Sequence, residues 1–194
     1  MLFASAAVAA AAIQSSNVYW FSDGSAVDGG SAQLVRTAHG VSMNVRTAGL
    51  EPGAAYTVWY VVFNNPEFCI NGIPDLTSCG EPDLLTPEVG GAVLYAAGHI
   101  VGASGRAGFA SALNVGELSG CQEPFAGFDL CGEGLTNPEG AEIHLVIRSH
   151  DEIIPSLLPT MFQTFSGGCT AESSLGAGTG PNECEDQQFV PFRP

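Results

Sequence analysis

The chain has 194 residues, of which 45% are hydrophobic and 13% are charged. It is therefore long enough to bury a hydrophobic core as one domain, which we expect over residues 13–194. With 20 acidic residues, five basic residues and a net charge of −15, the chain repels nucleic acid and anionic membrane surfaces, and we expect neither as a partner.

The N-terminus is an apolar segment. Residues 2–13 are almost purely Ala, Leu, Val and Phe, and this run is too short to span a bilayer. It matches the apolar region of a secretory signal, with a cleavage site at Ala10-x-Ala12, although no basic residue precedes Arg36. We therefore expect residues 1–12 to be signal-like and the protein to be secreted, periplasmic or at the cell surface. No second apolar stretch predicts a membrane span.

The hydrophobic pattern then has a period of two, with Gly or Pro at intervals of roughly ten residues, which favours a sandwich or barrel. A short strand is expected over residues 18–21. The Gly-rich loop at 22–31 contains Asp23 and Asp28, which could bind Ca²⁺ weakly. Because the loop completes no EF-hand pattern, we expect it to form turns.

A hairpin follows, with strands over residues 33–37 and 41–47. Val41, Met43 and Val45 alternate with polar residues, as in an antiparallel strand with one buried face. His39 precedes a glycine between the two strands, so we expect it in the turn rather than at a ligand site.

The next segment carries a local family resemblance. Residues 50–56 have the sequence LEPGAAY, which resembles the tyrosine corner of fibronectin type III and immunoglobulin-like domains. The resemblance implies a Greek-key sandwich in which the Tyr56 hydroxyl bonds to upstream backbone. The strand at 57–63 is apolar on both faces, so it is expected to be central or to have one face covered by a loop or a partner.

Long loops are expected over residues 64–91 and 116–140. Between them, strands over 92–101 and 106–115 are expected to form a second hairpin, because a Gly-rich turn separates them.

The clearest strand is expected over residues 141–149. A short helix is expected within residues 155–165. An edge strand over 187–192 would complete the fold.

Six cysteines form three close pairs in the sequence. Six cysteines allow 15 connectivities, and we predict the sequential one because short loops close at the smallest entropic cost. The predicted bridges are Cys69–Cys79, Cys121–Cys131 and Cys169–Cys184. Such bridges persist outside the reducing cytosol.

The run GAEIHLVIRSH at residues 140–150 resembles a group of uncharacterised exported bacterial β-sandwich proteins. That resemblance supplies no catalytic residue. Together, these observations predict an all-β fold, an antiparallel Greek-key β-sandwich with long disulfide-pinned loops and one short helix.

The same run holds the best candidate site. Residues two apart in a strand share a face, so Glu142 and His144 are expected side by side, with His150 further along. Imidazole and carboxylate suit Zn²⁺ or Cu²⁺. His99, on another strand with Tyr95 on its face, would be a third ligand.

A solvated face is the alternative interpretation, and we favour it. Arg148 lies between the two histidines, where it would repel a cation. In this alternative the side chains form a polar outer face in water, and Arg148 pairs with Glu142 or Asp151.

Three functions remain open. The first is an exported, non-catalytic β-sandwich for binding, adhesion or self-assembly, with a protein, a glycan or a second copy as its partner. The second is a metal-binding or redox protein that uses His144 with His150 or His99. The third is a hydrolase that uses a carboxylate pair, since 20 acidic residues offer many pairs. The sequence lacks a G-x-S-x-G nucleophile motif.

Overall fold

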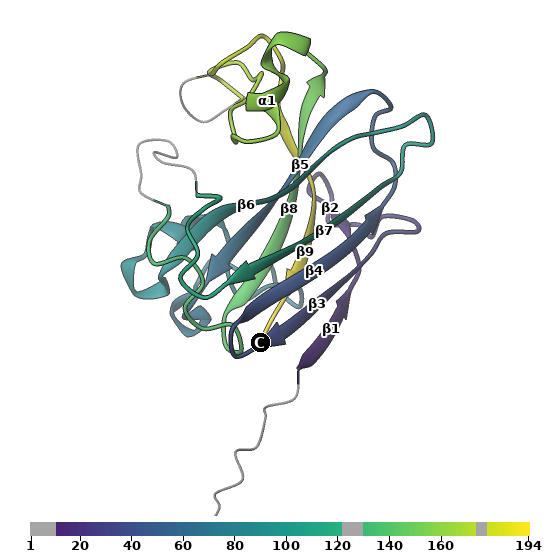
Figure 1. Cartoon of the computed structure of the whole chain (residues 1–194). Helices are drawn as coiled ribbons and strands as arrows, with labels where there is room; N and C mark the ends of the chain where they lie inside the picture. Colours follow the sequence, from purple (N-terminus) through teal and green to yellow (C-terminus); the bar gives the residue numbers. More distant parts are fainter. Residues whose placement is uncertain (1–10, 122–129, 174–177) are drawn as a thin grey trace, which may run out of the picture.

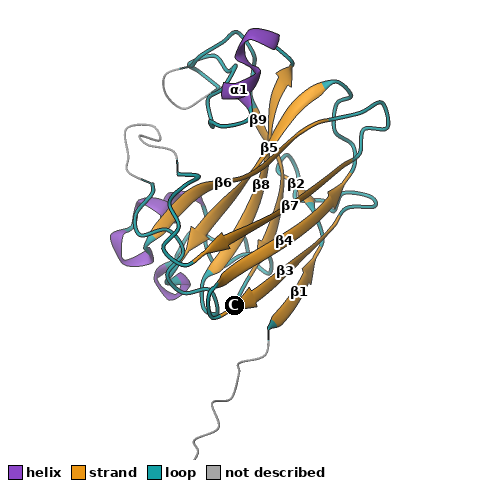
Figure 2. Cartoon of the chain, viewed as in Figure 1, coloured by secondary structure: helices purple, strands orange, loops and turns teal. Residues whose placement is uncertain are grey.

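A computed structural model describes residues 11–121, 130–173 and 178–194. Over these residues it shows two antiparallel β-sheets, one short α-helix and three disulfides (Figure 1). This confirms the all-β class and the two-sheet arrangement. The residues between the strands form long loops, with helical turns in two groups (Figure 2).

Sheet A has the strand order β1 (Ala12–Ser16), β3 (Ser31–Thr37), β4 (Gly40–Thr47), β7 (Ala107–Asn114). Sheet B has the order β2 (Tyr19–Trp20), β9 (Glu185–Phe192), β8 (Glu142–Glu152), β5 (Ala54–Phe63), β6 (Gly91–Ile100). The helical turns are η1 (Pro66–Phe68), η2 (Glu81–Leu85), η3 (Pro87–Val89), η4 (Pro155–Leu157) and α1 (Leu158–Met161).

The main core lies between the inner faces of the two sheets. On β4, Val41, Met43 and Val45 are buried while the residues between them are exposed, which is the period-two pattern of a strand with one wet face. The predicted hairpin of β3 and β4 is confirmed, with Thr37 opposite Gly40. His39 lies in its exposed turn, as expected.

The expected hydrogen bond of the tyrosine corner is present. The Tyr56 side chain is fully buried, and its hydroxyl accepts from the backbone N–H of Glu51 at 3.1 Å. The hydroxyl also lies 3.1 Å from the Gln187 side-chain oxygen, to which it donates. The strand order does not by itself confirm Greek-key connectivity, which stays a prediction.

The second predicted hairpin is wrong. β6 pairs with β5 in sheet B, whereas β7 pairs with β4 in sheet A. The turn around Gly105 (φ 64°) therefore carries the chain from one sheet to the other. Glycine in a turn indicates that the chain reverses, but it does not select the partner strand.

The C-terminal elements largely agree with expectation. The short helix expected within residues 155–165 is confirmed by η4 and α1. The C-terminal strand exists as β9, but it lies between β2 and β8 instead of at the sheet edge. The expected turn at Asp23 is confirmed, because its carboxylate accepts from the Ser25 N–H at 2.9 Å.

Two long segments cover the outer face of sheet B, and Leu130 from a further loop packs there with them. The first cover, residues 64–90, contains Cys69–Cys79, and the second cover, residues 153–173 and 178–184, contains Cys169–Cys184. Figure 1 places α1 of the second cover beyond one end of the strands, and the turns of the first cover near the other end. The sequential disulfide pairing is confirmed for all three pairs, including Cys121–Cys131.

The predicted signal-like segment lies mostly outside the described residues. Residues 1–10 are not described, and β1 begins at Ala12, where it pairs with Arg36 of β3. Among the described helices, none has the length and apolar character needed to cross a membrane.

Candidate ligand-binding pocket

The polar side chains of β8 share the outer face of sheet B, as the sequence predicts, but they are not in water. Glu142 and His150 are fully buried, Arg148 is 3% exposed and His144 is 8% exposed. The favoured expectation of a solvated face is therefore wrong. The two covers fold over the strand and replace water with backbone donors and aromatic rings.

Glu142 is an anion held by the first cover. Its carboxylate accepts from the backbone N–H groups of Ser78 at 2.9 Å and Cys79 at 3.1 Å. It also lies 2.7 Å from His144 Nε2. Burial acts to raise the pKa of Glu142, but the hydrogen bonds from His144, Cys79 and Ser78 outweigh it and the pKa is lowered. Glu142 is therefore ionised at neutral pH.

The first cover has its own organising carboxylate. Asp83 is fully buried and accepts from the backbone N–H groups of Ile70, Asn71 and Gly80. A Cβ at Gly80 would lie 2.1 Å from the Asn71 carbonyl oxygen, so this close approach requires glycine. Together with the Cys69–Cys79 bridge, these contacts fix the loop that presents its N–H groups to Glu142.

The two ring nitrogens of His144 differ in their surroundings. Nε2 donates to Glu142, because an ionised carboxylate only accepts. Its other nitrogen, Nδ1, has no hydrogen-bond partner in the described part of the chain. Among those residues the one fully buried side-chain polar atom without a partner is the Tyr60 hydroxyl, so Nδ1 is not sealed in. The ring packs edge-on against Phe63, with centroids 5.0 Å apart.

His150 uses both nitrogens. Nδ1 lies 2.7 Å from the Gly167 carbonyl oxygen and must donate to it, so in the neutral ring Nε2 accepts from the Thr57 hydroxyl at 2.8 Å. Thr57 in turn accepts from the indole N–H of Trp59. This chain of hydrogen bonds joins β5 and β8 to the second cover.

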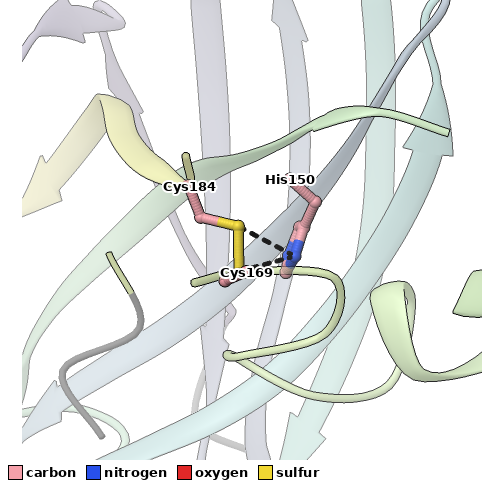
Figure 3. Close-up of side chains that lie close together, drawn as sticks. All are labelled: His150, Cys169 and Cys184. Atoms are coloured by element: carbon pink, nitrogen blue, oxygen red, sulfur yellow. Dashed lines mark hydrogen bonds between the residues drawn. A yellow bond between two sulfur atoms is a disulfide. The ribbon is translucent and has the colours of Figure 1, made fainter. Parts of the chain in front are cut away.

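The Cys169–Cys184 bridge lies against the same ring. The two sulfurs are 3.7 Å and 4.0 Å from His150 Nδ1 (Figure 3). Burial lowers the pKa of His150 to about 4, opposed by the hydrogen bond to Gly167 and assisted by the nearby Arg148. His150 is therefore neutral at pH 7 and has a structural role.

Arg148 binds the second cover. Its guanidinium donates to the Phe165 carbonyl oxygen at 3.0 Å and lies 3.9 Å from the centre of the Phe165 ring. It pairs with Asp186 at 2.8 Å. The expected pairing of Arg148 with Glu142 or Asp151 is therefore wrong, because Asp186 on β9 is the carboxylate that the sheet brings beside it.

His99 lies on the opposite face of sheet B from His144. Tyr95 is opposite Trp59 on the outer face, but a register shift follows, and His99 is opposite Tyr56 on the inner face. The prediction that Tyr95 and His99 share a face is therefore wrong, because a bulge changes the alternation. The His99 ring packs against Phe109, with centroids 5.9 Å apart.

The four predicted metal ligands do not assemble into one site. Only Glu142 and His144 are in contact. Within the described residues, two other groups lie close enough to hold a metal: His150 with Cys169 and Cys184, and Asp83 with Cys69 and Cys79. All four of these cysteines are in disulfides, whereas a thiolate is needed as ligand. The weak Ca²⁺ site at Asp23 or Asp28 stays a prediction.

A pocket of about 300 Å³ lies between the two covers. Its floor is the outer face of sheet B, with Trp59 and Val146 among the floor residues, and it is rich in aromatic rings. The aromatic residues of its lining are Phe21, Trp59, Phe63, Phe165 and Phe189. The polar and charged residues of its lining are Asn71, Thr77, Glu81, His144 and Asp186. An apolar cavity with a few placed polar groups is typical of a small-molecule site.

A larger depression of about 710 Å³ lies along β1, β3 and β4. Its lining is hydrophilic, with Ser, Asn and Gln side chains beside Tyr19 and Arg46. Glu142, His144 and the aromatic rings of the smaller pocket are not part of it. We therefore take the smaller pocket as the candidate site.

The chain matches no protein-family model and no curated protein sequence. The interpretation of the pocket therefore rests on its geometry. Sequence reasoning missed the pocket, although the doubly apolar strand β5 indicated that a loop or a partner would cover its outer face.

Proposed function

We propose that the protein is an exported, non-catalytic binding protein whose pocket takes a small, largely apolar ligand. The observation that carries this proposal is the aromatic-lined pocket of about 300 Å³ on the outer face of sheet B. Its volume lies at the small end of the usual range for ligand pockets, which suits a ligand of one or two rings.

The covers that form the walls of the pocket are held by disulfides and by buried polar contacts. The first cover is tied by Cys69–Cys79 and by the buried Asp83, and the second by Cys169–Cys184 and by Arg148. A pre-formed cavity lowers the ordering cost of binding. The disulfides also support export, because such bonds persist in oxidising compartments.

The two other candidate functions have weaker support. His144, His150 and His99 have separate surroundings, so a metal or redox centre lacks a convergent ligand set among the described residues. For the hydrolase, Glu142 accepts hydrogen bonds from three donors and Asp186 is paired with Arg148. These two carboxylates are therefore committed to structural contacts.

A fluorescence titration tests the proposal. 2-Methoxynaphthalene is an uncharged two-ring probe, and its own fluorescence anisotropy, excited beyond the tryptophan absorption band, reports its binding. We expect saturable 1:1 binding to the wild-type protein. Val146→Phe places extra volume on the floor and should weaken binding at least tenfold.

Two further variants make the result specific. Ile73→Trp narrows the pocket at a half-exposed position (47%), so it should weaken binding without disturbing the core. Asn44→Ala, at an exposed position of sheet A, should leave binding unchanged. The proposal is wrong if no saturable binding occurs, or if folded Val146→Phe and Ile73→Trp proteins bind as the wild type does.

A further inference from the structure

His144 gives the pocket a nearly buried polar atom that a ligand can meet. His144 is 8% exposed and its side chain 11% exposed; it lines the pocket, and its Nδ1 has no hydrogen-bond partner in the described part of the chain. A polar atom in such surroundings loses its hydration when an apolar ligand enters. The ligand must therefore supply a hydrogen bond to Nδ1, or its binding is weakened.

Glu142 determines which kind of hydrogen bond Nδ1 makes. The carboxylate has two backbone donors and takes the Nε2 proton of His144 as a third hydrogen bond. With the proton held on Nε2, Nδ1 of a neutral imidazole is an acceptor. The ligand group that faces it must then be a donor.

The remaining lining indicates an uncharged aromatic ligand. Asp186 is paired with Arg148 at 2.8 Å, so this carboxylate is already neutralised. Glu81 is exposed at the rim. Phe63, Phe165 and Phe189 line the pocket, and aromatic rings pack well edge-on against one another.

We infer that the ligand is an aromatic ring bearing a neutral hydrogen-bond donor, as in a phenol, and that Nδ1 of His144 accepts this hydrogen bond. The inference rests on the proposed function of the pocket. His144 is then the specificity-determining residue, and Glu142 is a positioning residue that acts through the imidazole.

Two matched probes test the inference. 2-Naphthol has a hydroxyl donor, whereas 2-methoxynaphthalene has the same rings and oxygen without the donor. By titration at pH 8, with the fluorescence anisotropy of each probe as the readout, the wild-type protein should bind 2-naphthol about fivefold to tenfold more tightly, as expected for one hydrogen bond.

Substitutions at His144, Glu142 and His99 should separate the roles of these residues in this preference. His144→Phe should bind the two probes equally and keep an affinity for 2-methoxynaphthalene within about threefold of wild type, since one hydrogen bond and not the pocket is lost. Glu142→Gln keeps a carbonyl oxygen at the Oε1 position, because that atom accepts from Ser78, Cys79 and His144, so the imidazole proton stays on Nε2. This variant should therefore retain the preference for 2-naphthol. His99→Phe, on the inner face, should retain the wild-type preference.

The outcomes separate the inference from the proposed function. If neither probe binds the wild-type protein, the proposed function fails. If both bind with equal affinity, the pocket stands and the inference is wrong. The inference is also wrong if folded His144→Phe protein keeps the preference for 2-naphthol; circular dichroism and thermal unfolding establish that each variant is folded.

Discussion

His144 and His150 lie on the same face of the same strand, β8, and both are nearly or fully buried. Their surroundings differ. His150 has both nitrogens in hydrogen bonds to Thr57 and Gly167 under the second cover. His144 lines a pocket, with one nitrogen bonded to Glu142 under the first cover and the other without a partner among the residues that the structure describes.

The comparison shows that the covers, and not the strand, decide what each histidine does. Where a cover packs directly onto the sheet, backbone carbonyls and hydroxyls satisfy the ring. Where the two covers leave a space between them, one nitrogen stays available. A buried polar group with all partners stabilises the fold, whereas one with a free acceptor can select a ligand.

The largest expected effect is on stability at the His150 end. His150→Ala removes two buried hydrogen bonds and leaves a cavity beside Cys169–Cys184, so the free energy of unfolding should fall by about 3–4 kcal/mol. Urea unfolding measures this change. His39→Ala, in an exposed turn, should change stability by less than about 0.5 kcal/mol. A loss below about 1 kcal/mol in His150→Ala would show that the His150 network is not structural.

Lowering the pH should also show the contribution of His150 to stability. The pKa of His150 is about 4 in the folded protein and about 6.5 when unfolded, so the unfolded state takes up the proton first. The contribution of neutral His150 to the free energy of unfolding is fully present above pH 6.5. This contribution is lost as the pH falls towards 4, and it amounts to about 3 kcal/mol.

Urea unfolding at a series of pH values measures the acid effect. The difference in free energy of unfolding between wild type and His150→Phe should shrink as the pH falls from 6.5 to 4. If this difference stays constant over that interval, His150 is not the titrating group.

A disulfide comparison separates stability from binding. Cys69–Cys79 and Cys121–Cys131 have the same sequence separation of 10, so replacing either pair by serines should cost a similar amount, about 2–3 kcal/mol. Cys69→Ser/Cys79→Ser alters the cover that holds Glu142 and His144, so this variant should weaken probe binding more than Cys121→Ser/Cys131→Ser does. Equal binding by the two folded variants would contradict the role assigned to the first cover.

The smallest effect concerns Tyr56, on the inner face of sheet B. Tyr56→Phe removes a hydroxyl bonded to Glu51 and Gln187, which should cost about 1 kcal/mol in urea unfolding. This value is the loss in free energy of unfolding expected when one buried hydroxyl is removed. The larger loss expected for His150→Ala can be compared with it. An unchanged denaturation midpoint would argue against the tyrosine corner.

The sequence predicts correctly those parts of the fold that depend on patterns within a short stretch of chain. Alternation at Val41, Met43 and Val45 identifies β4, and the spacing of the cysteines gives the correct bridges. The predictions of the partner strand of β7 and of the face that His99 occupies are wrong. Both depend on non-local events, which are a change of sheet and a register shift.

The candidate site is less predictable still. Alternation correctly places Glu142 beside His144, but it cannot show whether that face is in water. Burial of the face depends on Ser78, Cys79 and Phe165, which come from loops without a hydrophobic period. The doubly apolar β5 was the one local sign that something covers sheet B.

The most direct test of the account is the tautomeric state of the two buried histidines. Long-range ¹H–¹⁵N correlation spectra of the imidazole rings at pH 8 distinguish protons on Nδ1 from protons on Nε2. The structure predicts opposite tautomers, with the proton of His150 on Nδ1 and that of His144 on Nε2. Addition of 2-naphthol should shift the Nδ1 resonance of His144 and leave that of His150 in place. A proton on Nδ1 of His144, or the same tautomer in both rings, would contradict the account.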